Sequence, residues 1–122
     1  MLLILAGLAG FTAVAMGAFG AHALRDTLTP EAAAVYQTGT LYHLIHAVAL
    51  LGAALLAREE AAARLALWAG YAFAAGIVIF SGSLYLLAVS GVKWLGAITP
   101  IGGLAFLAGW TLIALAGWRS AA

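Results

Sequence analysis

The sequence predicts an all-α integral membrane protein, a single domain in which four transmembrane helices form an up-down-up-down bundle. Its 122 residues are 66% hydrophobic and only 7% charged, whereas a soluble domain carries about 25% charged residues. So few charges cannot cover the wet surface of a small globule. The composition therefore excludes a soluble enzyme, and a net charge of +1 excludes a nucleic-acid partner. With no cysteine, disulfides, thiolate metal sites and cysteine catalysis are excluded as well.

The charged residues divide the chain into four uncharged runs, each long enough for a helix to cross a hydrocarbon core of about 30 Å. Helices are expected because a lipid-facing segment must pair its own backbone groups. Short connectors then make successive helices antiparallel. The expected spans are residues 2–24, 35–57, 65–90 and 97–118.

Local signals mark two of the helix starts. Thr29, Pro30 and Glu31 form an N-cap, a first-position proline and a first-turn acid, so the second helix is expected to begin near Pro30, ahead of its span. Thr99 and Pro100 repeat the signal. The fourth helix either begins at Pro100 or is a longer helix from Trp94 with a kink at the proline.

Glycine lies inside the spans, where it allows helix backbones to approach closely. These small residues predict packing within the chain or, through the same ridges, between copies in a homo-oligomer. The expected packing residues are Gly17, Gly20, Gly82, Gly102, Gly103 and Gly109.

Polar residues within the spans are concentrated in one half of the bilayer, which predicts a polar pocket there. At about 100° per residue, Tyr42 and His46 share one face of the second helix, and Tyr36, Thr40 and His43 share a neighbouring face. Matching depths across the first hairpin places His22 near Gln37. The candidate binding residues are His22, Gln37, Tyr42, His46, Ser81, Ser83, Tyr85 and Thr99.

No catalytic residue is expected, because the spans contain neither a carboxylate nor a nucleophile with its base. No metal or cofactor is expected either, since the histidines lie at different depths without a carboxylate partner. Membrane lipid is the expected partner.

The basic residues give the orientation. Arg58, Arg64 and Arg119 lie at one end of the expected bundle, and Arg25 and Lys93 at the other. The positive-inside rule therefore favours both termini in the cytoplasm.

Several segments resemble a small family of four-span membrane proteins of unknown function that includes bacterial YgdD and YwdK. Its second helix is similar to Gln37-Thr38-Gly39-x-x-Tyr42-x-x-x-His46. The other matching segments are GAFGAH at 17–22, FSGSLYL at 80–86, TPIGG at 99–103 and FLAGW at 106–110. The resemblance implies a multi-pass protein of the bacterial inner (plasma) membrane, without an established reaction or cofactor.

The leading hypothesis is a structural or interaction role, in which the polar half fixes helix packing or presents a pocket to a partner or lipid. The first alternative is a small oligomeric transporter or channel with His22, Gln37, Tyr42 and His46 along its path. The second alternative is a haem, metal or quinone site.

Overall fold

The computed structural model describes residues 1–121, and the expected all-α class is confirmed. Four stretches are long and apolar enough to cross a membrane, and no strand occurs in the described chain. The third stretch is divided into α3, a π-helical turn η1 and α4. The elements are α1 (Leu2–His22), α2 (Pro30–Leu56), α3 (Ala63–Gly76), η1 (Ile77–Ser81), α4 (Gly82–Ser90) and α5 (Leu95–Ala121).

The second helix begins where its capping signal places it. The Thr29 hydroxyl accepts a hydrogen bond from the Ala32 amide at 3.2 Å, and Pro30 occupies the first turn. Because these first residues otherwise lack helical partners, the cap sets the helix start. At the far end of α4, Gly91 takes the left-handed conformation, with φ of 70°, that stops the helix.

The fourth helix is the longer of the two alternatives. It begins at Leu95 and contains Pro100 within its second turn. Proline has no amide hydrogen, so the carbonyl of Gly96 lacks its usual helical donor. In a membrane protein such a proline is tolerated where neighbouring helices and hydroxyl side chains compensate.

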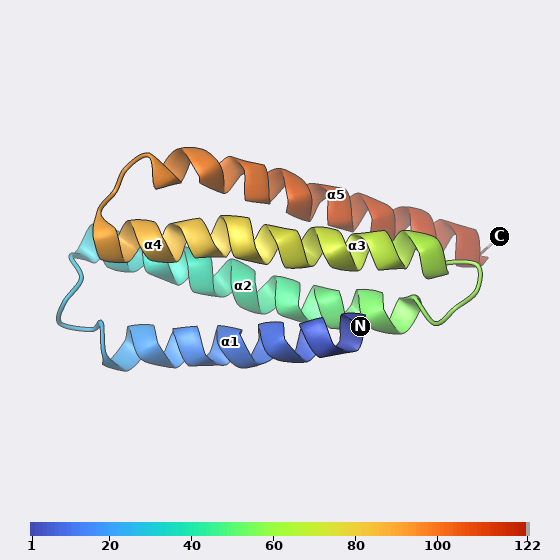
Figure 1. Ribbon diagram of the computed structural model, residues 1–122, viewed down its shortest axis with the longest axis horizontal. Helices are drawn as coiled ribbons and strands as arrows, with labels where there is room; N and C mark the ends of the chain where they lie inside the picture. Colours follow the sequence, from blue (N-terminus) through green and yellow to red (C-terminus); the bar gives the residue numbers. More distant parts are fainter. Residues whose placement is uncertain (122) are drawn as a thin grey trace.

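The helices are not equivalent in the bundle (Figure 1). α2 and the continuous rod of α3, η1 and α4 form the centre, with α1 packed mainly on α2, and α5 mainly on α3 and η1. The largest apolar cluster lies where α2 meets α3 and includes Leu50, Ala53 and Phe73, all fully buried. The two outer helices expose most of their apolar side chains.

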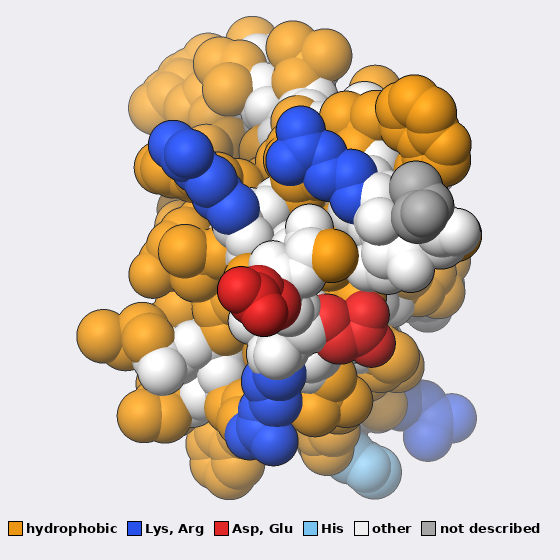
Figure 2. Space-filling view, turned by 90° about the vertical axis from the view of Figure 1, so that its right-hand side faces the viewer, with side chains coloured by type: hydrophobic (Ala, Val, Ile, Leu, Met, Phe, Trp, Pro, Cys, Tyr) orange, Lys and Arg blue, Asp and Glu red, His pale blue; other side chains and the backbone are white. Residues whose placement is uncertain are grey.

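Charged side chains gather at the ends of the bundle. Figure 2 looks at the end that carries the α2–α3 connector and the end of α5, where blue and red groups meet and hydrophobic side chains cover the flanks. In sequence these groups are Arg58, Glu59, Glu60, Arg64 and Arg119. The residues between the two ends form an apolar belt, as a membrane crossing requires.

Several glycines make room for aromatic rings on the facing helix. A Cβ at Gly20 would lie 2.8 Å from Cδ1 of Tyr36, and one at Gly109 would lie 2.7 Å from Cδ1 of Phe73. Gly102 faces the backbone of Phe80. Among the other expected packing glycines, contact is lighter: Gly17 reaches the Thr40 methyl at 3.4 Å, Gly103 reaches the Phe80 ring at 3.8 Å, and Gly82 meets nothing within 4 Å.

Candidate functional site

The polar side chains of the spans centre on α2, whose position between the other helices lets it bond to both sides. Tyr36, His43 and His46 are all at least 95% buried. Tyr36 and His43 face α1 and α4, whereas His46 faces α3 and α5. The polar residues therefore form two separate networks, one on each side of the helix.

His46 has both ring nitrogens occupied. Its Nδ1 lies 2.7 Å from the Tyr42 carbonyl oxygen, which only accepts, so Nδ1–H is the donor. The indole Nε1–H of Trp110 lies 3.1 Å from Nε2 and only donates, so Nε2 accepts. Phe106 stacks on the ring with centroids 3.5 Å apart and planes within 9°. This neutral histidine ties α2 to α5 and has no nitrogen left for a ligand.

His43 joins three helices. Its Nδ1 lies 3.0 Å from the Tyr85 hydroxyl, and its Nε2 lies 3.3 Å from Oγ1 of Thr12. Thr12 donates its one hydroxyl hydrogen to the Leu8 carbonyl at 2.8 Å. Nε2–H of His43 is then the donor to Thr12, and Nδ1 accepts from Tyr85. The imidazole bridges α1 and α4 through α2.

Two further bonds hold the same half of the bundle. The Tyr36 hydroxyl donates to the Met16 carbonyl at 2.6 Å, and its ring packs against Tyr85 with centroids 4.9 Å apart. Ser83 and Thr99 share a hydrogen bond of 2.7 Å between α4 and α5. Polar contacts in this half therefore join α1 to α2, α2 to α4, and α4 to α5.

Ser81 is the exception among the buried polar residues. It lies at the end of η1, fully buried, and its hydroxyl has no hydrogen-bond partner within residues 1–121. A serine in a regular helix bonds to a carbonyl of the preceding turn. The wider π turn changes that geometry.

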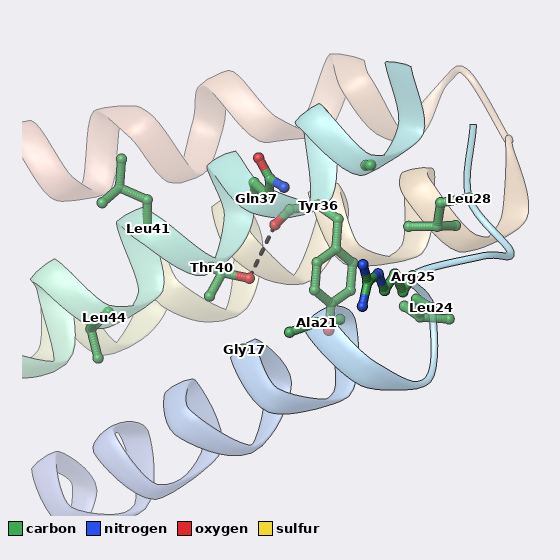
Figure 3. Close-up of a pocket in the computed structure, with 12 residues that line it drawn as sticks. Gly17, Ala21, Leu24, Arg25, Leu28, Tyr36, Gln37, Thr40, Leu41 and Leu44 are labelled. Atoms are coloured by element: carbon green, nitrogen blue, oxygen red, sulfur yellow. Dashed lines mark hydrogen bonds between the residues drawn. The ribbon is translucent and has the colours of Figure 1, made fainter. Parts of the chain in front are cut away.

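Two grooves flank α2. The first lies between α1 and α2 at the end of the connector 23–29 and has a volume of about 560 Å³ (Figure 3). Arg25, Gln37 and Thr40 supply most of its polar groups, and leucines supply its apolar wall. The second groove, about 530 Å³, lies between α2 and α5, where Tyr42 and Trp110 form part of a largely aromatic lining.

The eight predicted binding residues do not converge on one cavity. Gln37 lines the first groove, Tyr42 and His46 line the second, and His22 is exposed at the end of α1. Ser83, Thr99 and Tyr85 are engaged in the bonds described above, and Ser81 is enclosed. That these residues bind a ligand stays a prediction.

Sequence reasoning missed several partners in these networks, chiefly Trp110, Phe106 and Thr12. Trp110 and Phe106 lie in an apolar segment of α5, where an aromatic residue is the default. Thr12 is a single hydroxyl in an apolar helix. Two signals were available: the FLAGW segment at 106–110, and His46 itself, because a buried imidazole needs a donor for its free nitrogen.

His22, His43 and His46 do not come together as a cluster within residues 1–121. His43 and His46 contact different helices, and all four of their ring nitrogens have protein partners. Across residues 1–121, no three His, Asp or Glu side chains come together in a group that could hold a metal ion.

The four membrane-length helices, with charges at their ends and bonded polar residues between, define a multi-pass helical membrane protein. Comparison with known proteins agrees. The chain belongs to the family described as Protein of unknown function (DUF423), which matches residues 16–103.

Relatives match almost the whole chain. The UPF0382 membrane protein YwdK of Bacillus subtilis is 43% identical over 114 residues, covering 93% of each chain. The UPF0382 inner membrane protein YgdD of Escherichia coli is 43% identical over 112 residues, covering 92% of this chain and 85% of its own. A UPF0382 membrane protein of Staphylococcus epidermidis is 42% identical over 93% of this chain and 92% of its own. No solved structure gives a significant match.

Proposed function

We propose that this chain is a non-catalytic interaction protein of the bacterial plasma membrane, which binds a membrane lipid in the groove between α1 and α2. The observation that carries the proposal is a division among the polar side chains. Tyr36, His43 and His46 inside the bundle are hydrogen-bonded to neighbouring helices, while Arg25 and Gln37 at the groove have no side-chain partner in the described chain. The interior polar groups then serve helix packing, and the groove serves a ligand.

The packing role follows from the cost of an unpaired polar group in hydrocarbon. Each interior histidine uses both nitrogens within the bundle, so neither is available as a base or a metal ligand. Interhelical bonds of this kind hold membrane helices in one arrangement. A fixed arrangement of α1 and α2 keeps the groove between them open.

The groove has the size and lining of a ligand site. Its volume of about 560 Å³ lies within the range of roughly 300–1,000 Å³ that is common for ligand pockets. It opens on the flank of the bundle, where the surrounding medium is lipid. A lipid molecule is therefore the ligand with direct access.

We further propose that both termini lie in the cytoplasm. Three basic residues lie at the end shared by the α2–α3 connector and the end of α5, against two at the other end. The printed name of YgdD, an inner membrane protein, supports the plasma membrane as the location. The α1–α2 groove then faces the outer leaflet.

The proposal is tested by filling the groove. Ala21 is exposed and lines the groove, so Ala21→Phe places a ring in it. Ala18 is exposed on α1 outside the groove, and Ala18→Phe is the matched control. The readout is native mass spectrometry of protein released from mild detergent with added dioleoyl phospholipids.

We expect lipid adducts on the wild type and on Ala18→Phe, and a several-fold lower bound fraction on Ala21→Phe. Thermal unfolding in the same detergent shows whether each variant is folded. Equal lipid retention by the two folded variants would refute the groove as the site. No adduct on the wild type would refute lipid binding itself.

A further inference from the structure

We propose that the α1–α2 groove selects an anionic phospholipid, with the lipid phosphate at Arg25 and one acyl chain along α2. This inference rests on the proposed function, because it assumes that the groove holds a lipid. It adds the chemical class of that lipid and the residue that recognises it.

Arg25 provides the charge complementarity. It is the one charged side chain among the groove's lining residues, and it makes no ion pair within residues 1–121. The nearby acids, Asp26 and Glu31, are not part of the lining. A guanidinium binds a phosphate through two parallel hydrogen bonds, which makes arginine the preferred residue for this group.

Arg25 also lies at the right depth. It follows the end of α1 by three residues, in the connector where the headgroup region is expected. Figure 3 shows its guanidinium beside the Tyr36 ring, at the end of the groove away from Leu44. A phosphate at this point would remain in the polar layer while the rest of the lipid extends toward the bilayer centre.

Along α2 the polar lining residues precede the leucines in the inward direction, and Leu24 and Leu28 lie beside Arg25 at the outer end. Gln37, whose amide has no hydrogen-bond partner in the described residues, and Thr40 follow Arg25 inward, and then come Leu41 and Leu44. An amide beside the glycerol esters and leucines beside the acyl chain match the parts of the lipid in sequence. Gly17, Gly20 and Ala21 give the facing α1 wall only small residues in this part of the groove.

The groove has the length of one leaflet. From Ala33 to Leu44, α2 rises about 16 Å at roughly 1.5 Å per residue. Half of a hydrocarbon core of about 30 Å is about 15 Å. A single acyl chain can therefore run in the groove from the headgroup to the bilayer centre. A free phosphate would use only the Arg25 end and leave the leucine wall uncovered.

The test compares lipids that share acyl chains and differ in charge. Dioleoyl phosphatidylglycerol and dioleoyl phosphatidylcholine are titrated against the full chain, and native mass spectrometry measures both apparent affinities. Arg25→Gln removes the cation, and Arg58→Gln, in the connector at the opposite end, is the matched control. Arg25→Lys keeps the positive charge but lacks the planar guanidinium, whose two parallel N–H groups bind a phosphate.

We expect the wild type and Arg58→Gln to prefer phosphatidylglycerol by about tenfold, the scale of one hydrogen bond to a charged group. Arg25→Gln should bring this preference close to one, because it weakens phosphatidylglycerol binding more than phosphatidylcholine binding, whose choline cation already offsets the phosphate charge. The preference of Arg25→Lys for phosphatidylglycerol should lie between that of the wild type and that of Arg25→Gln. Glycerol 3-phosphate, which has the anion without acyl chains, should not displace the lipid.

The outcomes separate this inference from the proposed function. Lipid binding without a charge preference, or a preference that Arg25→Gln retains, overturns the inference and leaves the groove a general lipid site. If glycerol 3-phosphate displaces the lipid, the groove recognises a small anion and not a phospholipid, and the inference is overturned as well. If the wild type carries no lipid, or if a second copy of the chain fills the groove as a dimer that Ala21→Phe disrupts, both proposals fail.

Discussion

The contact between α5 and η1 makes a sharp prediction about two adjacent glycines. A Cβ at Gly102 would lie 2.7 Å from the Cα of Phe80 and still closer to its amide nitrogen. A Cβ at Gly103 would lie 3.8 Å from the Phe80 ring, an ordinary van der Waals distance. We predict that Gly102→Ala destabilises the bundle and that Gly103→Ala does not.

The magnitude follows from the distances. Carbon atoms pack best at about 3.5–4.0 Å, so the added methyl at Gly102 overlaps Phe80 Cα by about 0.8 Å. The obstructing atoms belong to the backbone of a buried helix, so they cannot rotate away, and α5 must shift. Such overpacking costs about 1–3 kcal/mol.

The shift would also be felt elsewhere along the interface. Phe106 of α5 rests against Gly76, and Gly109 of α5 rests against Phe73. Both contacts depend on the same close approach. Alanine has a higher helix propensity than glycine by about 1 kcal/mol, which favours both variants equally. The difference between the two variants therefore isolates the packing cost.

The assay is reversible unfolding in mixed detergent and SDS micelles, followed by circular dichroism. Gly102→Ala should be less stable than Gly103→Ala by about 1–3 kcal/mol. If the two free energies of unfolding agree within about 0.5 kcal/mol, the usual range for a neutral substitution, then α5 does not approach η1 as described.

Two other predictions concern the His46 network and the orientation. A double-mutant cycle of His46→Phe and Trp110→Phe should give a coupling free energy of about 0.6 kcal/mol and at most ~1.7 kcal/mol. The reason is that each single variant leaves the other partner without its hydrogen bond inside the membrane. Additive effects of the two substitutions in the same unfolding assay would contradict the hydrogen bond. For the orientation, the cysteine-free chain allows single-cysteine labelling of cells with a membrane-impermeant maleimide. Thr27→Cys should react from outside and Ser120→Cys only after permeabilisation, and the opposite pattern would show that the termini lie outside.

The helices were predictable because the bilayer limits the choices. Once charges are confined to connectors, each uncharged run must satisfy its own backbone, and only a helix does so. The start of α2 was also predictable, since Thr29, Pro30 and Glu31 act locally. These features depend on neighbouring residues in the sequence and not on the arrangement of the helices.

The π-helical turn was not predictable, because residues 77–81 carry no signal that distinguishes them from the rest of an apolar helix. Pro100 gave two alternatives, and the choice between them depends on tertiary contacts. The proline lies within α5 because the neighbouring helices hold that segment in place despite the missing amide hydrogen.

The predicted depth of α1 relative to α2 in the membrane was wrong by about one helical turn. Counting across the hairpin placed His22 near Gln37, whereas Gly20 is level with Tyr36 and Gly17 contacts Thr40. The connector length does not fix how far α2 extends beyond the end of α1. The glycine of α1 that makes room for a ring is therefore Gly20, which faces Tyr36.

The position of α2 explains why its polar residues do not line one common cavity. A polar face on a membrane helix must meet other helices, so the helix with the most polar residues belongs at the centre of the bundle. A central helix bonds on both sides, and residues about 60° apart, such as His43 and His46, turn to different neighbours. Residues that share a helix and a depth therefore share a function only if they also share a neighbour. Arg25 and Gln37 meet that criterion, because both line the same groove and neither has a side-chain partner in the described chain.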